Sequence, residues 1–147
     1  MVLDDAYFMR AALAEARAAF DADEVPVGAV IVANGRIIAR GHNMVERLKD
    51  VTAHAELMAF TSASASLGGK YLQDCSLYVT LEPCPMCAGA AYWTQIGRIV
   101  FGARDTKRGY GLFNAEIPFL HPSTIVEGGV LAEDCAELIR SYFRLKR

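Results

Sequence analysis

The sequence predicts an α/β protein, a three-layer α/β/α sandwich around a mixed five-stranded sheet. A continuous apolar run from Val27 to Ala33 is followed by Asn34-Gly35, a strong hairpin signal, so the first two strands should be antiparallel. Later strands alternate with helical segments, and strands joined through helices are expected to pair in parallel. A chain of 147 residues with 53% hydrophobic residues can form one domain, predicted to span 1–147, with a sizeable core.

The first half of the chain reads as a helix, a hairpin and a second helix. A helix is predicted over about 3–22, because hydrophobic residues recur there at spacings of three and four. Arg36 to Gly41 is the expected partner of the Val27–Ala33 strand. A polar stretch over 44–50 then leads into a helix that ends near Ala65, before Gly68-Gly69.

The second half alternates strands and helices. Residues 75–81 alternate apolar and polar side chains, as in a strand, and a helix is predicted from Pro85 to about Thr94. Residues 98–103 form the next predicted strand, before an irregular loop over 104–122. A short strand over 124–127 and a last helix over about 131–145 complete the chain. The apolar stripe of that helix consists of Cys135, Leu138, Ile139, Tyr142 and Leu145.

Two short motifs supply three donors for a metal ion and one further carboxylate. They are His54-Ala55-Glu56 and Pro83-Cys84-Pro85-Met86-Cys87. One imidazole and two thiolates suit Zn²⁺, and three protein ligands leave the fourth tetrahedral position for water. A glutamate beside that water can move its proton, which separates a hydrolytic site from a structural one. We therefore predict one zinc ion per subunit, held by His54, Cys84 and Cys87, with Glu56 as the catalytic residue.

The starts of two helices are expected to position these motifs. Thr52 can cap one helix, with His54 and Glu56 in its first turn. Cys84 can cap the other, with Pro85 at the first helical position. Cys84 and Cys87 then share one face, where the positive end of the helix favours thiolates.

Each motif alone also has a simpler interpretation. A lone C-x-x-C is often a redox pair or half of a zinc knuckle, and a lone histidine at a helix start usually belongs to the core. The combination of H-x-E with a later P-C-x-x-C matches the signature of zinc deaminases. A zinc-stabilised binding module without catalysis is the alternative from another class, and it would not need Glu56. Cys75 and Cys135 are expected to be buried as small hydrophobic residues.

Composition limits the partners and the compartment. A net charge of −2 argues against a broad electrostatic grip on nucleic acid, although four cations gather between Arg140 and Arg147 without an acid. These cations also suit a solvated last helical turn. No membrane-spanning run and no signal peptide are expected, and the cysteine usage suggests a reducing, cytoplasmic location.

Longer segments resemble the cytidine deaminase-like zinc hydrolases, and within them the bacterial tRNA-specific adenosine deaminases (TadA). The resemblance covers about 25–108 and 129–147. The zinc motif is common to the whole superfamily. The segments particular to the tRNA deaminases are Ala88-Gly89-Ala90, Gly97 to Asp105, and the tail from Tyr142 to Arg147.

The resemblance implies a cytidine deaminase-like fold and a hydrolase that converts adenosine to inosine at the wobble position of tRNA. It implies a homodimer with an anticodon stem-loop as partner, and the lack of a membrane-spanning run predicts no membrane partner. The substrate-binding residues that it implies are Asn43, Pro26, Val27 and Ala55. The residues expected near the RNA are Lys107, Phe143, Arg144 and Arg147; Phe143 is off the apolar stripe, whereas Tyr142 is expected in the core.

Three departures keep a free-base deaminase, such as guanine deaminase, as the alternative. Asn43-Met44-Val45 stands where the tRNA enzymes usually have Asn-Arg-Pro, which removes a cation. The segment from Arg108 to Phe113 is bulkier than their Gly-rich loop. The segment from Cys84 to Trp93, with the pattern Cys-Pro-Met-Cys-x-Gly-Ala-x-Tyr-Trp, resembles bacterial guanine deaminases. Packing or a dimer interface is the simpler role for its two aromatic residues, Tyr92 and Trp93.

Overall fold

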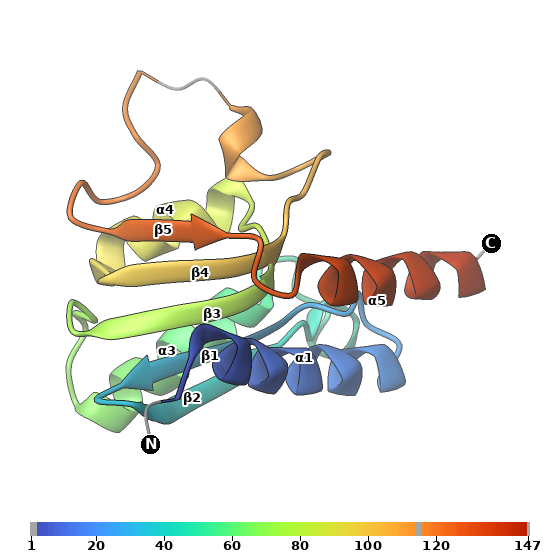
Figure 1. Ribbon diagram of the computed structural model, residues 1–147, viewed down its shortest axis with the longest axis horizontal. Coiled ribbons are helices and arrows are strands. Elements are labelled where there is room, and N and C mark those ends of the chain that lie inside the picture. Colours follow the sequence, from blue (N-terminus) through green and yellow to red (C-terminus); the bar gives the residue numbers. More distant parts are fainter. Residues whose placement is uncertain (1–2, 114–115, 147) are drawn as a thin grey trace.

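A mixed five-stranded sheet in the order β2-β1-β3-β4-β5 forms the centre of the molecule (Figure 1). The computed structural model describes residues 3–113 and 116–146. The strands are β1 (Gly28–Ala33), β2 (Arg36–His42), β3 (Cys75–Leu81), β4 (Arg98–Ala103) and β5 (Ile125–Gly128). The helices are α1 (Asp5–Asp21), α2 (Val45–Leu48), α3 (Ala55–Leu67), α4 (Pro85–Thr94) and α5 (Ala132–Leu145), and a 3-10 turn lies at Tyr110–Leu112.

The sheet is antiparallel on one side and parallel on the other. β1 is antiparallel to both β2 and β3, whereas β3, β4 and β5 run parallel. The predicted hairpin is confirmed, and Asn34 and Gly35 both have the positive φ that its tight turn requires (52° and 74°). The expectation that helix-joined strands pair directly is wrong for β2 and β3: they run in the same direction, but β1 lies between them.

Helices cover both faces of the sheet, as predicted. α1 and α5 pack on one face, and α3 and α4 pack on the other (Figure 1). The core under α3 and α4 contains alternate residues of β1 and β3, and the other face of the same strands contributes Val30, Val32 and Tyr78 to the core under α1. No helix in the described residues is both long and apolar enough to cross a membrane.

Two local predictions are wrong. Thr52 does not cap α3, because its backbone N–H and its hydroxyl both bond to the Asp50 carboxylate (2.8 and 2.7 Å), and His54 is the N-cap instead. The polar stretch over 44–50 contains the short helix α2, which no sequence signal indicated. Two backbone N–H groups at the start of α2 bond to the distant Glu24 carboxylate, at 2.9 Å each.

One edge of the sheet gathers the segments that carry the predicted site. The ends of the parallel strands β3 and β4 lie side by side, with Leu81 paired to Ala103. The start of β1 is also here, since Gly28 pairs with His42 at the end of β2 and donates its N–H to the Thr80 hydroxyl (3.1 Å). The carboxyl ends of parallel strands are the usual ligand edge of an open α/β sheet.

Candidate metal centre

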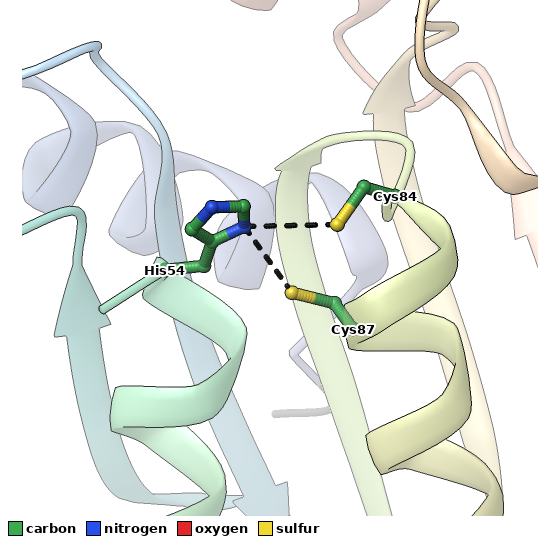
Figure 2. Close-up of side chains that lie close together, drawn as sticks. All are labelled: His54, Cys84 and Cys87. Carbon is green, nitrogen blue, oxygen red and sulfur yellow. Dashed lines mark hydrogen bonds between the residues drawn. The ribbon is translucent and has the colours of Figure 1, made fainter. Parts of the chain in front are cut away.

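Close packing of α3 on β2 fixes His54 at this edge. His54 has extended backbone (φ −81°, ψ 154°) directly before α3. Gly41 of β2 lies beneath the helix, where an added Cβ would be 2.6 Å from the Ala55 carbonyl oxygen. The helix start is therefore held by backbone contact with the sheet, and the imidazole points across to α4 (Figure 2).

The two cysteines lie at the start of α4, as the sequence predicted. Cys84 is the N-cap and Pro85 is the first helical residue. Cys87 is buried, and Cys84 is partly exposed. Both thiols point toward the imidazole of His54 (Figure 2), so residues 30 or more apart in the sequence form one cluster.

The donor atoms fit a zinc ion. The Nδ1 atom of His54 is 3.7 Å from the sulfur of Cys84 and 3.4 Å from that of Cys87, and the three donors lie within 4.8 Å of one another. Zn–S distances of about 2.3 Å and Zn–N distances of about 2.0 Å at tetrahedral angles place neighbouring donors roughly 3.5 Å apart. In the described residues, no other group of three or more His, Cys, Asp or Glu donors is arranged to hold a metal.

The electrostatics of the cluster favour a thiolate. The hydrogen bond from the Cys87 thiol is the largest cause that lowers the pKa of Cys84, to about 4, and His54 acts in the same direction. Cys84 in turn raises the pKa of His54 and that of the Cys87 thiol. The cluster thus shares its protons around one sulfur anion, and a bound cation would replace those protons.

Glu56 lies beside the donors without belonging to their set. It is in the first turn of α3 and is only 4% exposed. Burial raises the pKa of its carboxyl group to about 7, against smaller lowering effects from a backbone N–H, from His54 and from the Cys87 thiol. A carboxyl group that titrates near neutrality can both accept and return a proton.

The cluster opens into a large cleft. Its volume is about 1780 Å³, and His54, Glu56 and Cys84 are among its lining residues. Segments before β1, after β2 and after β4 form its walls, together with one side of α5. A pocket for one small molecule typically has about 300–1,000 Å³, so this cleft can hold more than a single base.

Asn43 stands between the cleft and α3. It is buried, and its side-chain oxygen accepts the N–H of Ala55 at 2.8 Å. Its own N–H donates to the carbonyl oxygen of Val27 (3.2 Å). With the side-chain oxygen engaged and Asn43 in the cleft wall, the amide nitrogen is the group that the residue can offer to a ligand.

The other predicted substrate residues lie at different depths. Val27 lines the cleft beside Val25, whereas Pro26 is buried and is not part of the lining. Ala55 is fully buried, so only its N–H, which holds Asn43, acts on the site. Pro26 and Ala55 thus shape the pocket from behind.

The predicted RNA-facing residues all lie on the cleft rim where they are described. Lys107 and Arg144 line the cleft, as does Phe143, which is 46% exposed, whereas Tyr142 is buried as expected. The cations of α5 and of its C-cap have acidic partners: Arg140 pairs with Glu133 and Glu137, Arg144 with Glu137, and the C-cap residue Lys146 with Asp23. Arg147 lies outside the described residues.

Sequence reasoning missed two buried carboxylates in the cleft wall, Glu24 and Glu82. Glu24 holds the start of α2, and Glu82 accepts the backbone N–H groups of Asp105 and Gly111 (3.1 Å each). Glu82 directly precedes the Pro83-Cys84 pair, and an acidic residue next to a metal motif could have marked it as part of the site. No sequence signal marks Glu24, because its hydrogen-bond partners are 22 or more residues away.

Comparisons with known proteins agree with this geometry. Residues 3–103 match the cytidine and deoxycytidylate deaminase zinc-binding region. The tRNA-specific adenosine deaminase of Agrobacterium fabrum is 45% identical over 144 residues, which are 96% of this chain and 95% of that protein. A structure from a study of A-to-I editing by tRNA:A34 deaminases superposes with a TM-score of 0.84 at 44% identity, over 90% of this chain and 98% of the other.

A guanine deaminase from Nitrosomonas europaea is more distant in sequence but similar in fold. Its TM-score is 0.81 at 29% identity, over 97% of this chain and 86% of the other. Both structures therefore share the fold, and the tRNA deaminase structure shares more of its sequence with this chain than this guanine deaminase does. The chain belongs to the zinc-dependent cytidine and deoxycytidylate deaminase family, on the branch of the tRNA-specific adenosine deaminases.

Proposed function

We propose that this protein is a hydrolytic deaminase that converts adenosine to inosine at the wobble position of tRNA. One observation carries the proposal: a tRNA-specific adenosine deaminase matches nearly the whole chain at 45% identity, and the matched part of this chain contains a His/Cys/Cys donor set that fits zinc. The reaction consumes one water and releases one ammonia, and the amine-bearing ring carbon gains the oxygen.

The site can be divided by role. His54, Cys84 and Cys87 would hold the zinc ion, which supplies Lewis acidity that makes water a nucleophile near neutral pH. Glu56 would take one proton from that water as general base and pass it to the ring nitrogen. It would then take the proton that remains on the added hydroxyl group and pass it to the departing amine, so both protons of the water are used. Burial of Glu56 supports this shuttle, because it raises the pKa of the carboxyl group to about 7, where the group can both accept and return a proton.

The cleft supports a polynucleotide substrate. An unstacked base would enter between Asn43 and Val27, with the Asn43 amide as hydrogen-bond donor. The remaining volume, with Lys107 and Phe143 on its rim, suits the flanking nucleotides. A wobble base already lies in a single-stranded loop, so unstacking it costs less than flipping a base out of a duplex.

The alternative substrate is a free base, guanine above all. The fold similarity to a guanine deaminase favours it. The Tyr92-Trp93 pair does not, because these side chains pack edge to face on each other on α4, and neither lines the cleft. Of the bulky segment from Arg108 to Phe113, only Arg108 lines the cleft.

One experiment separates the two substrates. The zinc-loaded enzyme is incubated with an anticodon stem-loop that carries adenosine at the wobble position, and separately with guanine. We expect inosine from the stem-loop, measured by mass spectrometry after nuclease digestion, and no xanthine from guanine. Turnover of guanine alone would contradict the proposed function.

We also propose that the protein acts as a homodimer in the cytoplasm, where tRNA is found. The outer face of α4 supports a self-association surface: Met86 and Trp93 are exposed there, and Trp93 is 77% exposed. An added Cβ at Gly89, between them on the helix, would meet no atom within 4 Å, so the space over this part of the face is open. The four cysteines are free, as suits a reducing compartment.

A further inference from the structure

Glu82 is a buried carboxylate that the proposed chemistry does not use. It follows directly after β3 and stands two residues before Cys84. Only 5% of the residue is exposed, and no lysine or arginine pairs with it in the described part of the chain. A buried charge is stable only when its oxygens are satisfied, so its partners indicate its purpose.

Those partners are backbone groups of a single loop, 104–112. Oε1 accepts the N–H of Asp105 and Oε2 accepts the N–H of Gly111, at 3.1 Å each. The neighbouring Pro83 carbonyl accepts the N–H of Tyr110 at 2.9 Å. Both ends of the loop are therefore bound to the two residues that lead into the metal-binding cysteine.

The loop wraps closely around the carboxylate. A Cβ built on Gly109 would be 2.6 Å from the Glu82 carboxyl group, and one built on Gly111 would be 2.7 Å from Oε2. At Gly109 the Cβ would also be 2.7 Å from the backbone carbonyl oxygen of Asp105, so glycine is required there, whereas at Gly111 the end of the Glu82 side chain would have to shift. Within this segment, the two glycines approach the Glu82 carboxyl group most closely.

The same loop presents cations to the cleft. The Asp105 side chain accepts the N–H groups of Lys107 and Arg108 (3.0 and 2.9 Å), which folds the loop into a tight turn. Both side chains line the cleft, and neither has an acidic partner in the described residues. The α5 cations, by contrast, are all paired within the chain where described. Lys107 and Arg108, on the loop held by Glu82, are therefore cations of the cleft rim that have no acidic partner in the described residues.

We propose that Glu82 is a positioning residue whose carboxylate holds loop 104–112 as a preformed, phosphate-binding rim beside the metal centre. The inference rests on the proposed function, since the phosphates would be those of the RNA that flank the reacting base. A rim fixed before binding loses little conformational entropy when RNA arrives, and this strengthens binding. We expect Glu82 to affect substrate affinity and not the chemical step, because it does not touch the reacting atoms.

The test compares Glu82→Gln with the wild-type enzyme. Glutamine keeps the size, but its amide cannot accept both N–H groups. We expect KM for the anticodon stem-loop to rise by about ten- to a hundredfold, the range for a lost charged hydrogen bond, while kcat changes much less. Zinc content stays at one per chain, and amide hydrogen exchange at Asp105 and Gly111 becomes faster.

Two further variants keep the test decisive. Gly111→Ala keeps the Glu82 residue but places a Cβ 2.7 Å from its Oε2, so the carboxylate and the Gly111 N–H must move apart. It should therefore raise KM in the same way even if Glu82→Gln folds poorly. Tyr78→Phe is the control. It removes a hydrogen bond between β3 and α1, from the Tyr78 hydroxyl to Asp5 (2.7 Å), and Tyr78 does not line the cleft, so KM should stay unchanged.

Three results would overturn the inference. They are an unchanged KM in Glu82→Gln, a loss of zinc from that variant, or unchanged exchange at Asp105 and Gly111. The exchange measurement needs no substrate. A wild-type enzyme that makes no inosine would therefore refute the proposed function, and the exchange data would still decide whether Glu82 holds the loop.

Discussion

Glu56 and His54 lie at the start of the same helix, but only His54 belongs to the donor set for zinc. A structural metal site has no need of a buried carboxylate beside it, whereas a hydrolytic site needs one to carry protons. We expect Glu56→Gln to lower kcat/KM by about 10²–10⁴-fold, the usual contribution of a general acid–base group, and to retain one zinc per chain. Inosine formation and metal content by atomic absorption measure the two effects separately.

The matched control is Glu127→Gln. Glu127 is exposed on β5, pairs with Arg98 and does not line the cleft. It should keep both activity and zinc. Loss of metal from Glu56→Gln would make Glu56 a zinc ligand, and the division between binding and proton transfer would then be wrong.

At the scale of elements, the contact between α3 and β2 decides the position of His54. An added Cβ at Gly41 would lie 2.6 Å from the Ala55 carbonyl and 2.9 Å from the Ala59 N–H nitrogen, both backbone atoms. The helix must therefore move away from the sheet, and His54 moves with it. We expect Gly41→Ala to lower zinc affinity by about 10- to 100-fold, as the loss of other supporting contacts does. Competition with a chromogenic chelator measures this change.

Gly97→Ala provides a clash of similar severity elsewhere. Its added Cβ would be 2.3 Å from the Gln73 carbonyl oxygen, at the start of β4 and therefore at the opposite end of that strand from the cleft. Both variants should lose about 1–3 kcal/mol of stability through overpacking. Equal losses of zinc affinity in the two variants would mean that general destabilisation, and not the position of α3, governs the site.

Elements defined by local signals could be predicted from the sequence. β3 and β4 have the predicted bounds, and α4 runs from Pro85 to Thr94 as expected, because strand alternation and an N-terminal proline act over a few residues. α2 depends on Glu24, far away in the sequence, and Thr52 lost its capping role to a competing bond with Asp50. The loop contacts of Glu82 are equally remote, so the metal donors were predictable but the structures that support the cleft were not.

At the scale of the whole molecule, Arg98 connects three elements. It bonds to Asp5 of α1 through both guanidinium ends (2.8 and 2.7 Å) and to Glu127 of β5 (2.9 Å). Hydrogen bonding from Arg98 is the largest cause that lowers the pKa of Asp5 below its usual value of 3.8, and Tyr78 adds to it. A folded pKa below the unfolded value means that the unfolded chain takes up the proton first as pH falls.

The stabilisation by Asp5 is therefore complete above about pH 4 and is lost as pH falls through the lower folded pKa. We expect Asp5→Asn to cost about 1–2 kcal/mol near neutral pH, the range for a partly exposed charged hydrogen bond. Its stability should then decline less steeply than that of the wild type in acid. Urea unfolding from pH 7 to pH 2 tests this, with the exposed Asp74→Asn as control. Parallel acid curves for wild type and Asp5→Asn would show that another group controls acid unfolding.

The proposed dimer links the outer face of α4 to the metal centre. α4 carries Cys84 and Cys87 at its start and the exposed Trp93 near its end, so a partner seated on this face would hold the helix that binds the metal. A large exposed aromatic side chain is a typical interface anchor, and its loss costs about 2 kcal/mol or more of association energy. We expect Trp93→Glu to reduce the mass measured by light scattering from that of two chains to that of one.

Tyr7→Glu is the control, because Tyr7 is also an exposed aromatic residue but lies on α1, on the opposite side of the sheet. It should leave the dimer intact. If the dimer supports α4, the Trp93→Glu monomer will also release zinc to a chelator faster than the wild type does, whereas Tyr7→Glu will not. Dissociation by Tyr7→Glu, with Trp93→Glu still dimeric, would place the interface on α1 and leave the start of α4 supported by its own chain alone.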